Sequence, residues 1–140
     1  MYLIFRSCSV FLCAWVLLLL SGCGGGSDVP VRYDLTGTVS FNGEPVPYGE
    51  ILFLPDNSKG NQGAGSVATI KEGRYQTPVG KGLIGGPYRV EIKGFDAPPI
   101  AGAVPVGGES APQPLFKKYE TNVDFPQESS TKDFQIPLLK

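Results

Sequence analysis

Apolar and polar residues alternate along short stretches of this chain, and this alternation is the main signal for its fold. In the stretch from Arg32 to Phe41, every second position faces one side of an extended backbone. On that side lie Tyr33, Leu35, Gly37, Val39 and Phe41. A period of two predicts a strand with one buried face and one face in water. The pair Asn42-Gly43 comes next and predicts a tight turn.

Two further stretches before residue 80 predict strands. Ile51–Leu54 is continuously apolar and ends at Pro55, which indicates either a strand buried on both faces or one in the middle of a sheet. Gly65–Lys71 and Arg74–Thr77 flank the dipeptide Glu72-Gly73, and this arrangement predicts a hairpin.

The second half of the chain predicts three more strands by the same alternation. Their inward-facing residues are expected to be Tyr88, Val90 and Ile92, then Val123 and Phe125, then Phe134, Ile136 and Leu138. Leu115–Tyr119 is compatible with a strand or with one helical turn. About seven short strands, separated by turns at intervals of about 8–12 residues, predict an all-β fold of the β-sandwich type.

Composition removes several classes of function. The chain has 140 residues with 19 Gly and 13 Pro, which favour turns over helices, and it has no His. The lack of His excludes His-based catalytic triads and His metal ligands. The net charge of −1 supplies no basic field for a nucleic acid. We therefore expect no nucleic-acid partner, no cofactor, no bound metal and no catalytic activity.

The N-terminal segment has the pattern of an export signal. Val10–Leu20 is uncharged, and as a helix these 11 residues span about 16 Å, against about 30 Å of bilayer hydrocarbon. Residues 1–22 are therefore predicted to be a signal peptide. The motif Leu20-Ser21-Gly22-Cys23 resembles the lipobox of bacterial lipoproteins. That resemblance implies cleavage before Cys23 and attachment of lipid to its thiol.

Other interpretations of this segment are a general secretory signal or a tilted membrane anchor over residues 3–20. Under the lipobox interpretation, residues 23–30 form a lipidated cysteine and a tether, in which the Gly-rich run Gly24–Asp28 reaches at most about 18 Å. The predicted location is the cell envelope. Gly at position 24, where Asp signals inner-membrane retention in some lipoproteins, favours the outer membrane. Cys8 and Cys13 leave with the signal, so the mature domain has no free thiol.

The remaining motifs resemble a known family. Gly37-x-Val39, Asn42–Val46 and Gly49-x-Ile51-x-Phe53 are similar to the opening of carboxypeptidase regulatory-like domains, and Glu72–Tyr75 with Gly86–Val90 are similar to their middle signature. The resemblance implies that residues 31–140 form one domain, a seven-stranded Greek-key β-sandwich of the transthyretin-like (prealbumin-like) type. It also implies a non-catalytic module.

The expected function is that of a lipid-anchored structural or interaction module of the cell envelope, which contacts the membrane through acyl chains and an envelope protein or glycan through its domain. The alternative is a carbohydrate- or peptide-binding module, for which Tyr48 and Tyr119 are candidate aromatic residues.

Three other features carry weaker signals. Asp56–Gly63 is rich in oxygen ligands, but Lys59 interrupts it and no bidentate Glu closes it, so a solvated turn is favoured over a calcium site. Glu50 and Glu91 are the carboxylates considered for a shared cleft. Ala97–Pro114 is rich in Pro and Gly and predicts a long surface loop.

Overall fold

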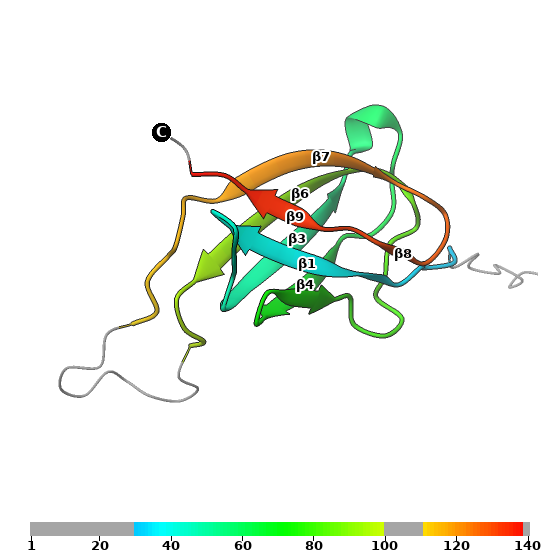
Figure 1. Cartoon of the computed structure of the whole chain (residues 1–140). Coiled ribbons are helices and arrows are strands. Elements are labelled where there is room, and N and C mark those ends of the chain that lie inside the picture. Colours follow the sequence, from blue (N-terminus) through cyan, green and yellow to red (C-terminus); the bar gives the residue numbers. More distant parts are fainter. Residues whose placement is uncertain (1–29, 100–110, 139–140) are drawn as a thin grey trace, which may run out of the picture.

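A computed structural model describes residues 30–99 and 111–138 (Figure 1). The predicted signal peptide, Cys23, the Gly-rich run and residues 100–110 lie outside the described residues. Nine strands and one 3₁₀ turn form the described part. They are β1 (Leu35–Phe41), β2 (Glu44–Pro45), β3 (Tyr48–Pro55), η1 (Asn57–Lys59), β4 (Ser66–Lys71), β5 (Arg74–Gln76), β6 (Gly86–Phe95), β7 (Tyr119–Phe125), β8 (Ser130–Thr131) and β9 (Phe134–Ile136).

The strands form one sheet in the order β2-β1-β5-β4-β3-β6-β7, with every pair along this path antiparallel. β8 and β9 pair in parallel with β1, on the edge opposite β5. The sheet curls, so that β1 and β9 lie in front of β3 and β6 (Figure 1). The prediction of an all-β fold is confirmed for residues 30–99 and 111–138.

Both predicted two-residue turns are present. Asn42 and Gly43 have φ values of 51° and 87°, and Glu72 and Gly73 have φ values of 51° and 75°. Two successive residues with positive φ match the twist of the flanking strands in a tight hairpin. Gly at the second position adopts this conformation without the penalty of a Cβ.

Burial follows the predicted alternation. In β1, Leu35 and Val39 are buried, and in β6 the inward residues Tyr88, Val90 and Ile92 are all at most 1% exposed. The strands therefore turn one apolar face to a shared core.

β3 is an interior strand of the sheet, because it pairs with β4 on one side and β6 on the other. Ile51 and Phe53 are fully buried, whereas Leu52 and Leu54 are only half-buried on the opposite face. Of the two interpretations of Ile51–Leu54, the strand in the middle of a sheet is the one observed.

A chain of ring contacts crosses the core and ties together strands that are distant in sequence. Neighbouring ring centroids are 5.8–6.1 Å apart along the series Phe134, Tyr75, Phe53, Phe125 and Tyr88. These rings come from β9, β5, β3, β7 and β6 in that order. The two halves of the curled sheet therefore share one core, in which aromatic contacts add to apolar burial.

Two expectations for the C-terminal half need revision. Leu138 was expected to face inward, but it is 57% exposed, because β9 ends at Ile136 and Pro137 follows it without a backbone donor. The stretch before β7 is not a helical turn: Pro114 makes an isolated bridge with Phe95, residues 115–117 form a bend, and β7 starts at Tyr119.

Candidate functional site

The domain has two ends, which are defined by β1. At its start, the Arg32 guanidinium donates to the Gly82 carbonyl, and Tyr33 bridges to Leu83. We call this the entry end, because the N-terminal residues precede it. β1 then runs across the domain to Phe41, which marks the far end (Figure 1). Seven residues at about 3.3 Å each separate the ends of this strand by about 20 Å.

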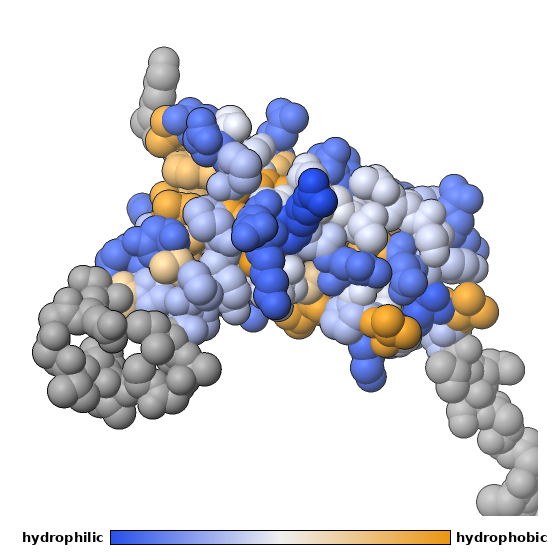
Figure 2. Space-filling view, turned by 60° about the horizontal axis from the view of Figure 1, so that its bottom comes forward, coloured by the Kyte–Doolittle hydropathy of each residue, from blue (hydrophilic) through white to orange (hydrophobic). Residues whose placement is uncertain are grey.

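An apolar groove of about 650 Å³ opens at the far end. It is lined by Phe41, Leu115, Phe116, Lys117, Lys118, Tyr119, Glu120, Ile136, Pro137 and Leu138. The Phe41 and Phe116 rings pack with their centroids 5.0 Å apart. Hydrophobic side chains gather on the surface near the C-terminal end of the described chain (Figure 2). We call this hollow the far-end groove.

The far-end groove lies between β7 and β9. Within the described residues, β7 pairs only with β6, and β9 pairs only with β1. Each strand therefore has one edge without a strand partner there. Unpaired strand edges beside an apolar hollow are the features that bind extended peptides.

Charged residues on one rim of the groove are held in place by one another. The Lys118 ammonium lies 3.2 Å from Glu91 and also contacts Glu120, and Arg89 lies 3.5 Å from Glu91. Hydrogen bonds to Glu120 and then to Glu91 raise the pKa of Lys118, and the bond from Lys118 lowers the pKa of Glu120. Both shifts favour the charged forms of Lys118 and Glu120.

A second, wider hollow of about 780 Å³ lies on the outer face of β1, β4 and β5. Its lining includes the hydroxyl residues Thr36, Thr38, Thr69 and Thr131, together with Lys71, Arg74, Gln76 and Asp133. At one side, Asp133 accepts hydrogen bonds from the backbone N–H and the hydroxyl of Thr38, both at 2.8 Å. These bonds lower the pKa of Asp133. We call this surface the outer hollow.

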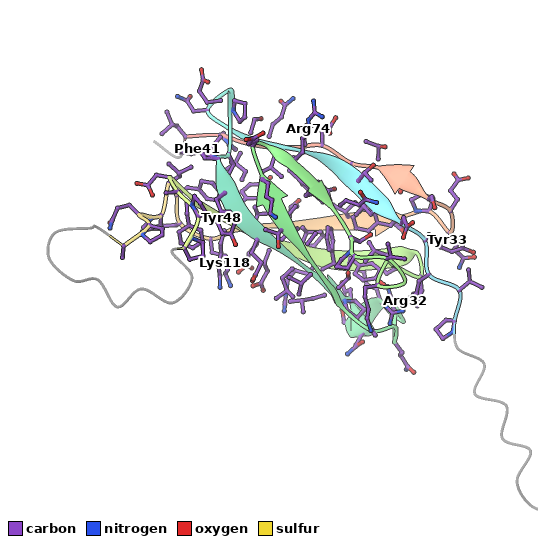
Figure 3. The ribbon with its side chains drawn as sticks, turned by 90° about the horizontal axis from the view of Figure 1, so that it is seen from below. Arg32, Tyr33, Phe41, Tyr48, Arg74 and Lys118 are labelled. Carbon is purple, nitrogen blue, oxygen red and sulfur yellow. The ribbon has the colours of Figure 1, made fainter. Side chains whose placement is uncertain are left out.

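The two tyrosines expected to form an aromatic platform do not meet. Tyr48 lies on the outer face of β3, opposite Lys71 and Phe95, whereas Tyr119 lies on the inner face of β7 and lines the far-end groove. Figure 3 shows Tyr48 together with Phe41 and Lys118 toward one end of the domain.

The aromatic pair that does form, Phe41 with Phe116, was missed by the sequence analysis. The alternation predicts that Phe41 lies on the core face of its strand, and it leaves the structure around Phe116 open. One sequence signal for this surface exists. Phe116 and Tyr119 are aromatic residues next to Lys117 and Lys118, and they follow a Pro/Gly-rich segment.

Glu50 and Glu91, the candidate carboxylate pair, lie on an open sheet face and not in a shared cleft. Glu50 is opposite Lys93, and Glu91 is opposite Leu52, so the two acids are diagonal neighbours on β3 and β6. Glu91 is engaged by Lys118 and Arg89. The arrangement is an ion-pair network on a surface.

The loop after β3 is a capped turn, as the sequence favoured. The Asp56 carboxylate accepts from the backbone N–H of Ser58 at 3.1 Å and lies 3.7 Å from Lys59. The hydroxyl of Ser58 is the largest cause that lowers the pKa of Asp56. Within residues 30–99 and 111–138, no group of three or more His, Cys, Asp or Glu is placed to hold a metal ion.

Comparisons with family models, with curated proteins and with solved structures each find no match for this chain. Among the described residues, no helix has the length and apolarity needed to cross a membrane.

Proposed function

We propose that this protein is a lipid-anchored, non-catalytic interaction module of the bacterial cell envelope, attached through Cys23. The outer membrane is the favoured site, because Gly follows Cys23. The observation that carries the proposal is the Leu20-Ser21-Gly22-Cys23 motif at the end of an uncharged apolar run, followed by a Gly-rich tether. Several acyl chains on one residue hold a protein firmly, because each buried methylene contributes about 0.8 kcal/mol.

The placement of the domain surfaces supports an interaction role. The chain enters the domain at Arg32 and Tyr33, whereas the far-end groove lies about 20 Å away at the other end of β1. An anchor upstream of Arg32 therefore joins the domain at the end opposite the groove. The carboxylates nearest to the groove, Glu91 and Glu120, are engaged by Lys118, which supports binding over acid–base chemistry.

Metabolic labelling tests the anchor. The wild-type chain, expressed in a bacterial host with an alkyne fatty acid, should incorporate label, and Cys23→Ser should not. Cys13→Ser is the matched control, since it removes a thiol from the predicted signal and should leave labelling unchanged. Equal labelling of the wild type and Cys23→Ser would remove the basis for the anchor.

A second candidate function is peptide binding by the far-end groove. It is favoured by the Phe41–Phe116 ring pair between two unpaired strand edges. The expected ligand is an extended peptide that adds to an edge and places apolar side chains in the groove. A peptide array should give binders whose affinity falls with Phe116→Ser and is unchanged by Val79→Ser, which removes a 90% exposed apolar side chain away from the groove. Binders that ignore Phe116→Ser would contradict this candidate.

The transthyretin-like sandwich belongs to the same proposal. It is supported by the short junction between β4 and β5, which share two register pairs, against eight between β3 and β6. Such a junction is suited to a corner between two packed layers. Amide hydrogen exchange should then be faster at Lys71 and Arg74 than along β3. Uniform protection across all four strands would argue for one continuous layer.

A further inference from the structure

Two cations face each other across the β4–β5 hairpin. Lys71 and Arg74 are register partners on either side of the Glu72-Gly73 turn, and both are exposed on the outer face. Directly opposite residues of an antiparallel pair have their Cβ atoms about 5 Å apart, and like charges in this position destabilise the sheet. Within the part of the chain that the structure describes, no carboxylate oxygen lies within 4.0 Å of the Lys71 ammonium or the Arg74 guanidinium. The ion pairs found there involve other lysine and arginine side chains.

The sheet contains an acidic counterpart to this pair, and that pair is neutralised. Glu91 and Glu120 are also directly opposite each other, on β6 and β7. The Lys118 ammonium contacts both carboxylates, at 3.2 Å from Glu91. The protein thus supplies a close counter-ion for its cross-strand acids, whereas no described carboxylate lies within 4.0 Å of Lys71 or Arg74. Glu50, the diagonal neighbour of Lys71 on β3, is directly opposite Lys93.

The surroundings of the two cations match a hydroxylated ligand. They lie in the outer hollow with Thr69 and Gln76, whose side chains donate and accept hydrogen bonds, and with Thr38, whose hydroxyl donates to Asp133 and can accept a further bond. Tyr48 is the register partner of Lys71 on β3, so an aromatic ring continues the same row on the same face. The nearest carboxylate of the hollow, that of Asp133, is bonded to Thr38.

The position of the row argues against the headgroups of the membrane that holds the anchor. The hairpin turn is bound to the connection after β2, because the Glu72 and Gly73 amides donate to the Pro47 and Val46 carbonyls. That connection follows the Asn42-Gly43 turn at the far end. In Figure 3, Arg74 and Tyr48 lie away from Arg32 and Tyr33, which mark the entry end.

We propose that Lys71, Arg74 and Tyr48 form a binding site for an acidic polysaccharide, a second site that is separate from the far-end groove. A carboxylate of the polymer lies between the two cations, with the Arg74 guanidinium able to bind it in a bidentate manner. One sugar ring of the polymer packs on Tyr48, and hydroxyls of the neighbouring sugars along the row bond to Thr69, Gln76 and Thr38. The bound carboxylate is the counter-ion that the cross-strand pair lacks.

The test uses the full chain in a non-ionic detergent and calorimetric titration with a short oligogalacturonate. The double variant Lys71→Gln/Arg74→Gln should lose at least about tenfold in affinity, since one charge-assisted hydrogen bond is worth about 1.5–3 kcal/mol and 1.4 kcal/mol is tenfold. The matched control Lys59→Gln/Lys81→Gln removes two charges elsewhere and should stay within about twofold. Removing the repulsion should leave the unfolding midpoint of the double variant unchanged or higher, so a folding failure is not expected.

Further probes separate the polysaccharide from other anions. Wild-type binding should weaken with added salt and should be absent for a neutral maltooligosaccharide. Tyr48→Leu should weaken oligogalacturonate binding and leave the binding of inorganic polyphosphate unchanged. The proposal is overturned if the wild type does not bind oligogalacturonate, if both double variants lose affinity equally, or if phosphatidylglycerol vesicles bind as well as the oligosaccharide does.

Discussion

Phe53 is the residue whose truncation tests the packing of the core most directly. It is fully buried in the interior strand β3, and its ring centroid lies 6.1 Å from that of Tyr75 and 5.9 Å from that of Phe125. Phe53→Ala removes the ring and leaves a cavity between strands from both halves of the curled sheet. Such truncations cost about 3–5 kcal/mol, out of a total of about 5–15 kcal/mol for a domain.

Urea unfolding of residues 27–140, which contain every described strand, measures this loss. With an m-value of about 1.5 kcal/mol per molar urea, the midpoint should fall by about 2–3 M. In a thermal scan, the melting temperature should fall by at least about 12 °C. Val67→Ala is the control, because Val67 is 44% exposed on the outer face of β4, and its loss should cost less than about 1 kcal/mol. If Phe53→Ala cost less than 1 kcal/mol, β3 would not be the centre of the core.

Three further predictions concern the sheet, the acid limb and the long loop. Gly37→Ala should lower the free energy of unfolding by more than about 2 kcal/mol, because the added Cβ would lie 1.9 Å from the Lys132 carbonyl oxygen. That oxygen also accepts a 2.7 Å hydrogen bond from the Tyr75 hydroxyl, so it is not free to move away. An unchanged urea midpoint would contradict this close approach. The hydrogen bond from the Thr38 hydroxyl is the main cause that lowers the pKa of Asp133 in the folded protein. The stability that the ionised carboxylate contributes is therefore complete at pH values above the pKa of Asp133 in the unfolded chain. It is lost as the pH falls through the lower pKa of Asp133 in the folded protein. Asp133→Asn should therefore be less stable near neutral pH and lose less stability on acidification below about pH 4, as measured by urea titrations at several pH values. Replacing residues 98–112 by a short Gly-Ser linker should shift the free energy of unfolding by less than about 1 kcal/mol. Asp96 and Gln113 close the base of this segment by two hydrogen bonds, and the entropy of loop closure grows slowly with loop length. Loss of cooperative unfolding would show that the segment is part of the fold.

Local sequence determined much of the strand pattern. Alternation is a property of neighbouring residues, so it located β1 and β6 and identified their buried faces, while the turn signal at Glu72-Gly73 located β4 and β5 on either side of it. The turns at Asn42-Gly43 and Glu72-Gly73 were equally visible, because positive φ restricts the residues that can occupy them. The same hairpin places Lys71 directly opposite Arg74, because a two-residue turn pairs the residues on its two sides.

Only the tertiary structure decided which distant segments meet. The parallel pairing of β8 and β9 with β1 joins residues about 95 positions apart, as in the Thr38–Asp133 bonds, and no local pattern encodes such a partner. The far-end groove likewise combines Phe41, Phe116 and Leu138 from three separate segments. A period of two determines on which face of a strand each side chain lies, but it does not determine which strand pairs with which. Neighbours are chosen by the packing of all faces into one core, and this choice also separated Tyr48 from Tyr119.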